Sequence, residues 1–354
     1  MPAINAQRQQ GLALITVLLV FAVVSVLAVA IIDRQAINIQ RSANMFTLQQ
    51  SRAFTDAAEQ AVRVGLYLDW DADKEKDHAN EEWTQPRTFP LEPGKIYLKI
   101  TDAQGRFNLN SLSAGAANKT LQTQRFANLL NLLGLDTQLA NATARWMDKS
   151  SQIDDVYESL DVPYRPAYQA CKHVSELLLI ENFDQATYQA LLPYISCLPV
   201  EVQLNVNTAS AVVLASLDSG LSLQDGQSLV SARGEEGYAS VDDFWNQSLL
   251  ERYTQPQTND NDDADNGGNS NNGNNNSENA QPRWEKSDFS INSEYFEMFA
   301  RVDLNERYAT SEALIKRDKA DARMTTLYRD YSRREEKPSE QSFETNTDIN
   351  TNSN

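Results

Sequence analysis

Residues 12–32 form an unbroken apolar run without a single charge, LALITVLLVFAVVSVLAVAII. About 20 apolar residues suffice for a helix to cross the hydrocarbon core of a bilayer. A secretory signal peptide would have a shorter apolar run ending in a small-residue cleavage site, whereas this run continues without Gly or Pro into a helix-compatible stretch that reaches Val64. We therefore expect a retained transmembrane anchor. Its helix, Leu12–Val64, would be roughly 80 Å long at 1.5 Å per residue and would end at Gly65.

The rest of the chain is polar and acidic. Its 354 residues carry a formal net charge of −18, which favours solubility and argues against binding of a phosphate backbone. The two cysteines, Cys171 and Cys197, lie far from the anchor. An even pair on an exported domain predicts a disulfide, worth about 3–4 kcal/mol in the chain-entropy model, with two buried free thiols as the alternative.

Two strand-forming regions flank a long helical block. Residues 95–112, KIYLKITDAQGRFNLNSL, alternate apolar and polar positions and then supply a turn at 102–105, which predicts a hairpin. Residues 295–304 place five apolar side chains on one face, and 313–318 form a further candidate strand. Between them, 120–250 has helical patterns, the first closing at Gly134. The chain is therefore predicted to be an α+β protein whose sheet is interrupted by a large inserted all-helical domain.

Several motifs carry a family resemblance. QGLALITVLL at 10–19 resembles the type IV pilin-like processing signal, and the resemblance implies that a prepilin peptidase cuts between Gly11 and Leu12 and methylates the new terminus. DAQGRFNLNSL at 102–112, WMDKSSQIDDVYESLDVPYRPA at 146–167 and LNVNTASAVVLASL at 204–217 add to it. Together these segments resemble the minor pseudopilin K family of type II secretion systems.

The resemblance implies a non-enzymatic role in capping and helping to nucleate the pseudopilus that exports folded proteins. It also implies a single pass through the bacterial inner membrane and a C-terminal domain in the periplasm. The expected partners are I-type and J-type minor pseudopilins, the major pseudopilin and the prepilin peptidase. The candidate contacts of the assembly helix are Thr16, Ile37, Met45, Phe46 and Phe54.

The expected organisation has seven parts. They are a cleaved leader (1–11), the transmembrane and extended helix (12–64), the first part of a pilin-like head (65–115), an inserted helical domain (116–258), a disordered Asn-rich insert (259–281), the second part of the head (282–332) and a disordered tail (333–354).

Thr16 stands at the fifth mature position, where pilin-like proteins normally carry a Glu. In such fibres that carboxylate is thought to neutralise the buried amino terminus of the neighbour towards the tip. A subunit without such a neighbour does not need the carboxylate, so Thr16 suits the tip. Simple tolerance of Thr in an apolar helix is an equally weighted interpretation.

An acidic segment is the candidate metal site. Calcium takes six to eight oxygen ligands, and members of the resembled family bind calcium in the inserted domain. Ser150 departs from the family pattern, and a solvated acidic loop is the alternative. The candidate ligands are Asp148, Asp154, Asp155, Glu158 and Asp161.

Residues 204–244 resemble the helix-hairpin-helix module of competence proteins, which binds phosphates through backbone N–H groups of a Gly-rich hairpin. A DNA-handling pilin-like competence protein is therefore the alternative function. Here one Gly stands where two are wanted, Asp218 and Asp225 flank it, and Arg233 is the only basic residue. We expect a structural module and no nucleic acid. The chain also lacks a G-x-S-x-G elbow, a P-loop and an H-E-x-x-H pair.

Overall fold

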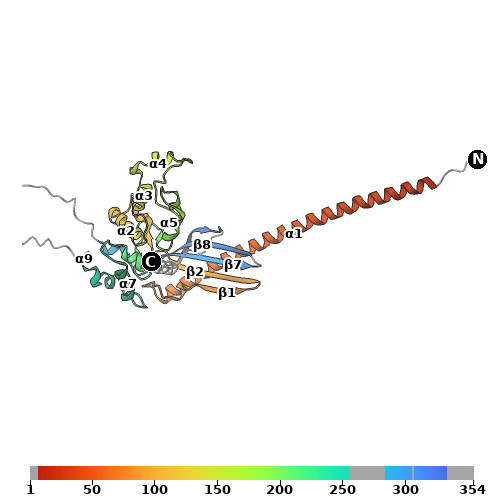
Figure 1. Cartoon of the computed structure of the whole chain (residues 1–354). Coiled ribbons are helices and arrows are strands. Elements are labelled where there is room, and N and C mark those ends of the chain that lie inside the picture. The colour runs from red at the N-terminus through yellow and green to blue at the C-terminus, as the bar shows by residue number, and fades with distance from the viewer. Residues whose placement is uncertain (1–6, 255–283, 305–306, 333–354) are drawn as a thin grey trace, which may run out of the picture.

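The computed structural model describes residues 7–254, 284–304 and 307–332. Helix α1, Gln7–Ala72, projects far beyond a head that combines a sheet with a domain of short helices (Figure 1). The predicted disordered insert and tail lie outside the described residues, and so does most of the predicted leader.

Five antiparallel strands form the sheet in the order β1-β2-β7-β8-β9. Strands β2 and β7 pair from Gly94 opposite Leu304 to Asp102 opposite Phe296, although the whole inserted domain separates them along the chain. The predicted interruption of one sheet by an insertion is therefore confirmed. The strands are β1 Arg87–Leu91, β2 Gly94–Asp102, β7 Tyr295–Leu304, β8 Arg307–Arg317 and β9 Met324–Asp330.

The last third of α1 packs on one face of this sheet. Ala58, Val62 and Leu66, which are spaced at helical intervals, are buried against Phe296 and Met298 of β7 and their neighbours on β2 and β8. The predicted helix end at Gly65 is wrong, since α1 continues to Ala72. Burial of Leu66 against the sheet outweighs the modest helix penalty of one Gly.

The predicted strand at 295–304 is confirmed as β7, whose alternate residues Phe296, Met298, Ala300, Val302 and Leu304 are all buried. The candidate strand at 313–318 is the second half of β8. Strand β1 has no clear signal in the sequence because it is an edge strand, contains Pro90 and exposes four of its five residues.

The predicted hairpin at 95–112 is wrong. The partner of β2 on that side is β1, joined to it through the turn at 92–93. Beyond Asp102 the chain leaves the sheet, and β3, Phe107–Asn108, pairs in parallel with β4, Ile195–Ser196. Phe107 is drawn into the core of the inserted domain, where its ring stacks on that of Phe126. Burial in a different core therefore decides the path of this segment.

The inserted domain has a core that includes residues on both sides of the predicted borders 116 and 258. Phe107, Leu109 and Leu112 before the predicted start, and Trp284 and Phe289 after the predicted end, belong to its single hydrophobic core. It is also not all-helical, because β3 pairs with β4 and β5, Leu204–Asn205, pairs with β6, Phe289–Ser290.

Short helices build this domain in two lobes (Figure 1). The first lobe contains α2 Lys119–Leu132, α3 Gln138–Trp146, α4 Asp154–Glu158 and α5 Gln185–Leu191, and the second contains α6 Ala211–Ala215, α7 Leu223–Ala232, α8 Val241–Trp245 and α9 Glu251–Thr254. Single 3-10 turns lie at Glu82–Thr84, Leu109–Leu112, Lys149–Ser151, Val174–Leu179, Ser248–Leu250 and Lys286–Asp288.

The end of α2 follows the prediction. Gly134 has a φ of +68°, and the backbone N–H of Leu135 donates to the carbonyl of Leu130 at 2.8 Å while that of Gly134 donates to Asn131 at 3.0 Å. These two bonds satisfy carbonyls that the helix end leaves open, which is the Schellman arrangement.

Candidate assembly helix and the joint of the inserted domain

Most of α1 lies outside the head and exposes apolar side chains. Its 61 residues from Leu12 to Ala72 include a window long and apolar enough to cross a membrane, none of it buried in the protein. Beyond that window, Ile37, Met45 and Phe46, three of the candidate assembly contacts, are 50–67% exposed. Phe54 is half-buried, because α1 already lies against the head there. The free length of the helix thus exposes apolar side chains that the described part of the chain does not cover.

Thr16 satisfies its hydroxyl within its own helix. Its Oγ1 donates to the carbonyl oxygens of Ala13 at 2.9 Å and Leu12 at 3.2 Å. A hydroxyl bonded in this way can lie in an apolar transmembrane helix without a hydrogen-bond acceptor from another chain. The helix itself includes the predicted cleavage point at Gly11 and Leu12, since α1 begins at Gln7.

Arg317, at the end of β8, joins α1 to the loop that follows it and to the point where the chain leaves the insertion. Its guanidinium donates to the carbonyls of Leu66 at 3.2 Å and Ser293 at 3.1 Å, pairs with Asp69 at 3.4 Å and forms a close ion pair with Asp77. The side chains of Arg317 and Asp77 are almost completely buried. A buried pair with this many hydrogen bonds is costly to break from one side.

Asn205 is the second centre of the same joint. Its amide nitrogen donates to Ser293 Oγ at 2.8 Å, to the Asp77 carbonyl at 3.1 Å and to Asp102 Oδ2 at 3.2 Å. Asp102 ends β2, where the chain enters the insertion, and Ser293 lies where the chain leaves it. The second asparagine, Asn207, makes two bonds to the backbone of Tyr238, at 3.0 and 2.7 Å. This polar joint, consisting of Asp77, Asp102, Asn205, Ser293 and Arg317, fixes the insertion to the sheet and to α1.

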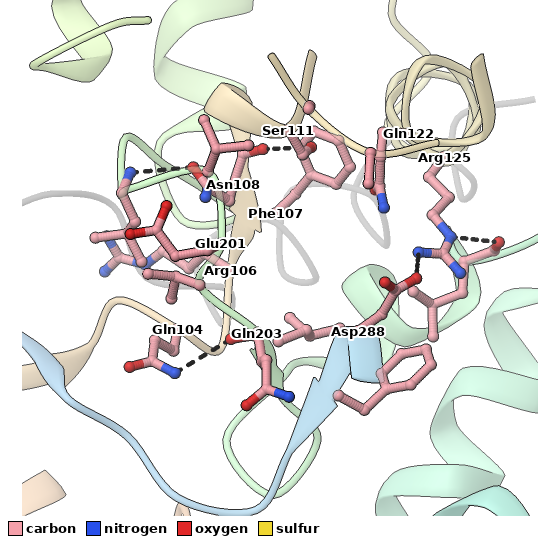
Figure 2. A pocket seen from close by; sticks show the side chains of 18 of the residues that line it. Gln104, Arg106, Phe107, Asn108, Ser111, Gln122, Arg125, Glu201, Gln203 and Asp288 are labelled. Carbon is pink, nitrogen blue, oxygen red and sulfur yellow. Dashed lines mark hydrogen bonds and ion pairs between the residues drawn. The ribbon is translucent and has the colours of Figure 1, made fainter. Parts of the chain in front are cut away.

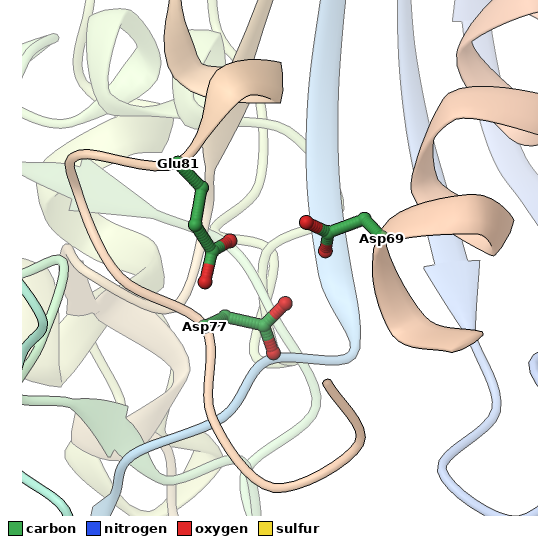
Figure 3. A group of neighbouring side chains, drawn as sticks. All are labelled: Asp69, Asp77 and Glu81. Atoms are coloured by element: carbon green, nitrogen blue, oxygen red, sulfur yellow. The ribbon is translucent and has the colours of Figure 1, made fainter. Parts of the chain in front are cut away.

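Three carboxylates meet beside the joint, as Figure 3 shows. Asp69, Asp77 and Glu81 bring one oxygen each within 4.8 Å of the others. Burial, with the nearby Asp69 charge, raises the pKa of Glu81 to about 8. Burial and the charge of Asp77 likewise raise the pKa of Asp69 to about 6, despite Arg317. Arg317 pairs with Asp69 and Asp77, two of the three carboxylates, so the folded protein retains protons here that the unfolded chain releases.

This retention gives stability a defined pH dependence. A folded-state pKa above the unfolded value means that the native state binds more protons, so stability is complete below about pH 4 and is lost as pH rises through 6 to 8. We expect the free energy of unfolding to fall by roughly 2 kcal/mol between pH 6 and pH 9, measured by urea titration. Glu81→Gln, neutral at every pH, should remove most of that fall. Glu82→Gln, at the exposed neighbouring position, should leave it unchanged, and equal slopes for both variants would contradict this assignment.

The predicted disulfide is confirmed. Cys171 and Cys197 are joined with a Cα–Cα distance of 5.7 Å. Beside it, the amide nitrogen of Asn110 donates to the carbonyls of Cys171 at 2.9 Å and Leu198 at 2.8 Å, and its oxygen accepts from the Cys171 N–H at 2.7 Å. The crosslink and this buried amide therefore hold the two ends of the 172–196 segment to the start of the insertion.

The five acidic candidates of the predicted calcium site do not converge. Asp148 pairs with Lys119, Asp154 accepts from the Tyr168 hydroxyl at 2.9 Å, and Glu158 lies 3.6 Å from Arg165. Within residues 7–254, 284–304 and 307–332, the one group of three close candidate metal ligands is the Asp69 trio. In this conformation the segment therefore does not present a ready set of calcium ligands.

In the segment 204–244, which resembles a helix-hairpin-helix module, α6 and α7 pack against each other across residues 216–222. The N–H groups that would face a phosphate are already bonded to carboxylates. Gly220 donates to Asp218 at 2.8 Å, and Ser222 donates to Asp225 at 2.8 Å. Arg233 turns inward and donates to the carbonyls of Val206 and Ala209 at 3.0 and 2.7 Å. The module contributes to packing through these contacts, and carboxylates at the hairpin repel a phosphate.

A cavity of about 210 Å³ lies between the lobes (Figure 2). One wall is the ion pair between Arg125 of α2 and Asp288, with 3.1 Å between Nη1 and Oδ2. Arg125 also donates to the Leu217 carbonyl at 3.3 Å, and its guanidinium lies 5.3 Å from the Trp284 ring. Burial lowers the pKa of Arg125. These contacts tie the first lobe to the second and to the returning chain.

Comparison with known proteins agrees with this architecture. Residues 105–200 and 204–262 match two family models, both described as type II secretion system (T2SS), protein K. Type II secretion system protein K of Pseudomonas aeruginosa is 37% identical over 256 residues, covering 67% of this chain and 76% of that protein. The chain belongs to the type II secretion system protein K family.

Other protein K relatives show the same extent of similarity. The Klebsiella pneumoniae protein is 34% identical over 265 residues, covering 69% of this chain and 81% of that protein. The crystal structure of the GspK-GspI-GspJ complex from the enterotoxigenic Escherichia coli type 2 secretion system contains a chain that matches with a TM-score of 0.65 at 24% identity. The match covers 83% of this chain and all of that one, which shows a shared fold.

The two protein K models match the inserted domain, and neither covers α1 or β1 and β2. The gap between them, at 201–203, falls immediately before β5, where the first lobe gives way to the second. The polar joint of this chain was not predicted from the sequence. Its available signal was the pair Asn205 and Asn207 within an otherwise apolar stretch, both fully buried.

Proposed function

We propose that this chain is a minor pseudopilin that caps and helps to nucleate the pseudopilus of a type II secretion system. It is anchored once in the bacterial inner membrane, with its head in the periplasm, and its role is non-enzymatic. The observation that carries the proposal is the exposed apolar surface of α1, which extends from the membrane-length window through Phe46. Membership of the protein K family supplies the secretion system to which this surface belongs.

The proposed partners are minor pseudopilins of the I and J types, followed by the major pseudopilin. The similar crystal structure is that of such a complex, formed by the Escherichia coli proteins. The proposed maturation is cleavage between Gly11 and Leu12 by the prepilin peptidase, followed by methylation. A tip position agrees with two features of this chain. Thr16 stands where pilin-like proteins normally carry a carboxylate for the neighbour towards the tip, and the large inserted domain would obstruct close stacking of identical subunits in a shaft.

Co-purification tests the assembly helix. The full chain in detergent, mixed with the I-type and J-type proteins of the same bacterium, should elute with them in size-exclusion chromatography. Ile39→Ser combined with Phe46→Ser should lower recovery of the complex at least tenfold, because both side chains are exposed in the single chain.

The matched control is Phe89→Ser, which removes an exposed apolar side chain from edge strand β1 instead of α1. It should leave recovery unchanged, and none of the three substitutions should alter the melting temperature of the head. Undiminished recovery with the α1 variant would show that this surface is not the assembly contact.

We also propose calcium binding by the acidic segment 148–161. This proposal is supported by the number of acidic residues close together in the sequence and by the preference of calcium for oxygen ligands. Binding would require Asp148 to leave Lys119 and the other carboxylates to move together. We expect millimolar calcium to raise the melting temperature of the full chain by mass action, and magnesium to raise it much less. Asp154→Ala or Asp155→Ala should abolish that rise. The control Asp73→Ala, at an exposed acidic position just after α1, should retain it. A melting temperature that calcium does not change would exclude the site.

A further inference from the structure

A second group of exposed apolar side chains lies on the first lobe, in the loop after α4 and in the 3-10 helix Val174–Leu179. Figure 1 shows α4 at the outer end of this lobe, away from the projecting part of α1. Four large aliphatic side chains are exposed on two neighbouring segments. Val162 is 77% exposed and Leu160 37%, on the loop after α4, and Leu179 is 49% exposed and Leu178 38%, at the end of a 3-10 helix. We call these four residues the distal patch. Grouped exposed apolar side chains of this size mark contact sites more often than single ones do.

A hydrogen bond and packed aromatic rings beneath the distal patch hold its two segments together. The Tyr164 hydroxyl, two residues after Val162, donates to the carbonyl of Leu179 at 2.8 Å. The Tyr164 ring packs on Tyr157 with 5.4 Å between centroids, and Tyr157 packs on Trp146 at 5.0 Å. This aromatic layer belongs to the domain core, so the patch has a fixed base. The core is complete without the patch, since Leu177 and Ile180 already fill the buried side of its second segment.

Acidic residues outnumber basic ones in the segments that carry the distal patch. Between 148 and 181 the chain has seven acidic and three basic residues. Asp155, Glu158, Asp161 and Glu181 are all exposed there. Arg165 lies 3.6 Å from Glu158, but both side chains are largely exposed, so this pair neutralises little of the field. An apolar surface with an acidic rim repels acidic proteins and anionic lipids and attracts cations.

We propose that the distal patch docks a protein segment presenting an apolar side chain flanked by lysine or arginine. The apolar side chain would be buried between Val162 and Leu179, and the flanking cations would lie over Glu158, Asp161 and Glu181. This contact is separate from the assembly surface of α1 and does not depend on the proposed pseudopilin function. It shares Glu158 and Asp161 with the proposed calcium site, so the peptide and calcium would compete for these carboxylates, and the test is made without calcium. It adds a binding role to the inserted domain.

The test uses the full chain in nanodiscs of zwitterionic lipid and three fluorescent 12-residue peptides. The first has leucines flanked by lysines, the second replaces the lysines by glutamates, and the third replaces the leucines by serines. In fluorescence anisotropy, with empty nanodiscs as the blank, the first should bind saturably and at least tenfold more tightly than the other two. Its affinity should also fall as salt rises, because the rim charges are screened.

Variants locate the site. Val162→Ser with Leu179→Ser should weaken binding of the first peptide at least tenfold. The control Leu327→Ser, at a similarly exposed position on β9, should not weaken it. Both variants should keep the melting temperature of the parent chain. Unchanged affinity in the double variant, or equal affinity for the serine peptide, would overturn the proposal, since either result would show attraction by net charge alone.

Discussion

Replacing Arg317 by methionine is expected to destabilise the head by about 3–5 kcal/mol in urea unfolding. The substitution keeps most of the apolar volume but removes the bonds to Leu66, Asp77 and Ser293 at once. Asp77 would then remain buried next to Asp69 and Glu81 without a cation. The loss of stability should be smaller in the double variant with Asp77→Asn, because the second substitution removes the uncompensated buried charge.

The control for this prediction is Arg323→Met, just beyond the end of β8. Arg323 pairs with Asp321 at 3.2 Å, but both side chains are exposed, so its removal should cost less than about 0.5 kcal/mol. Similar losses for the two arginines would show that the joint contributes no more than a surface ion pair.

The second large effect is expected at Gly226, inside α7. A Cβ at this position would lie 2.1 Å from the carbonyl oxygen of Ala211, so Gly226→Ala must force α6 and α7 apart. Such overpacking costs about 1–3 kcal/mol, and a backbone obstacle puts this case at the upper end. Urea unfolding measures the loss, and far-ultraviolet circular dichroism checks that the helices remain.

Gly65→Ala is the matched helical control. Gly65 lies within α1, and a methyl group added there would have no heavy atom of another residue within 4 Å, its chain neighbours and its own helix backbone aside. Alanine at this position should therefore stabilise the protein by about 0.5–1 kcal/mol. If both substitutions stabilise the protein, helix propensity and not the α6–α7 contact determines the result at Gly226.

Features that depend on local pattern were predictable from the sequence. The apolar run from Leu12 predicts a membrane-length helix, alternation predicts the buried face of β7, and a Gly after an amphipathic stretch predicts the end of α2 at Gly134. The interruption of the sheet followed from two strand regions on either side of a helical block. The disulfide followed from having two cysteines and from the exported location that the anchor implies. Each of these depends on a short window or on composition.

Contacts between distant segments were decided only by the tertiary structure. Phe107 does not form the predicted hairpin because its ring is buried in the core of the inserted domain, stacked on the ring of Phe126. Helix α1 continues beyond Gly65 because Leu66 is buried against the sheet. Asp77 and Arg317 are far apart along the chain, and burial beside one another makes them part of the joint.

The acidic segment 148–161 shows the same limit of local pattern. Its carboxylates are close in sequence, yet Asp148, Asp154 and Glu158 each have a different partner in the fold. Burial and charge pairing act between neighbours in space, and local sequence patterns do not record those neighbours.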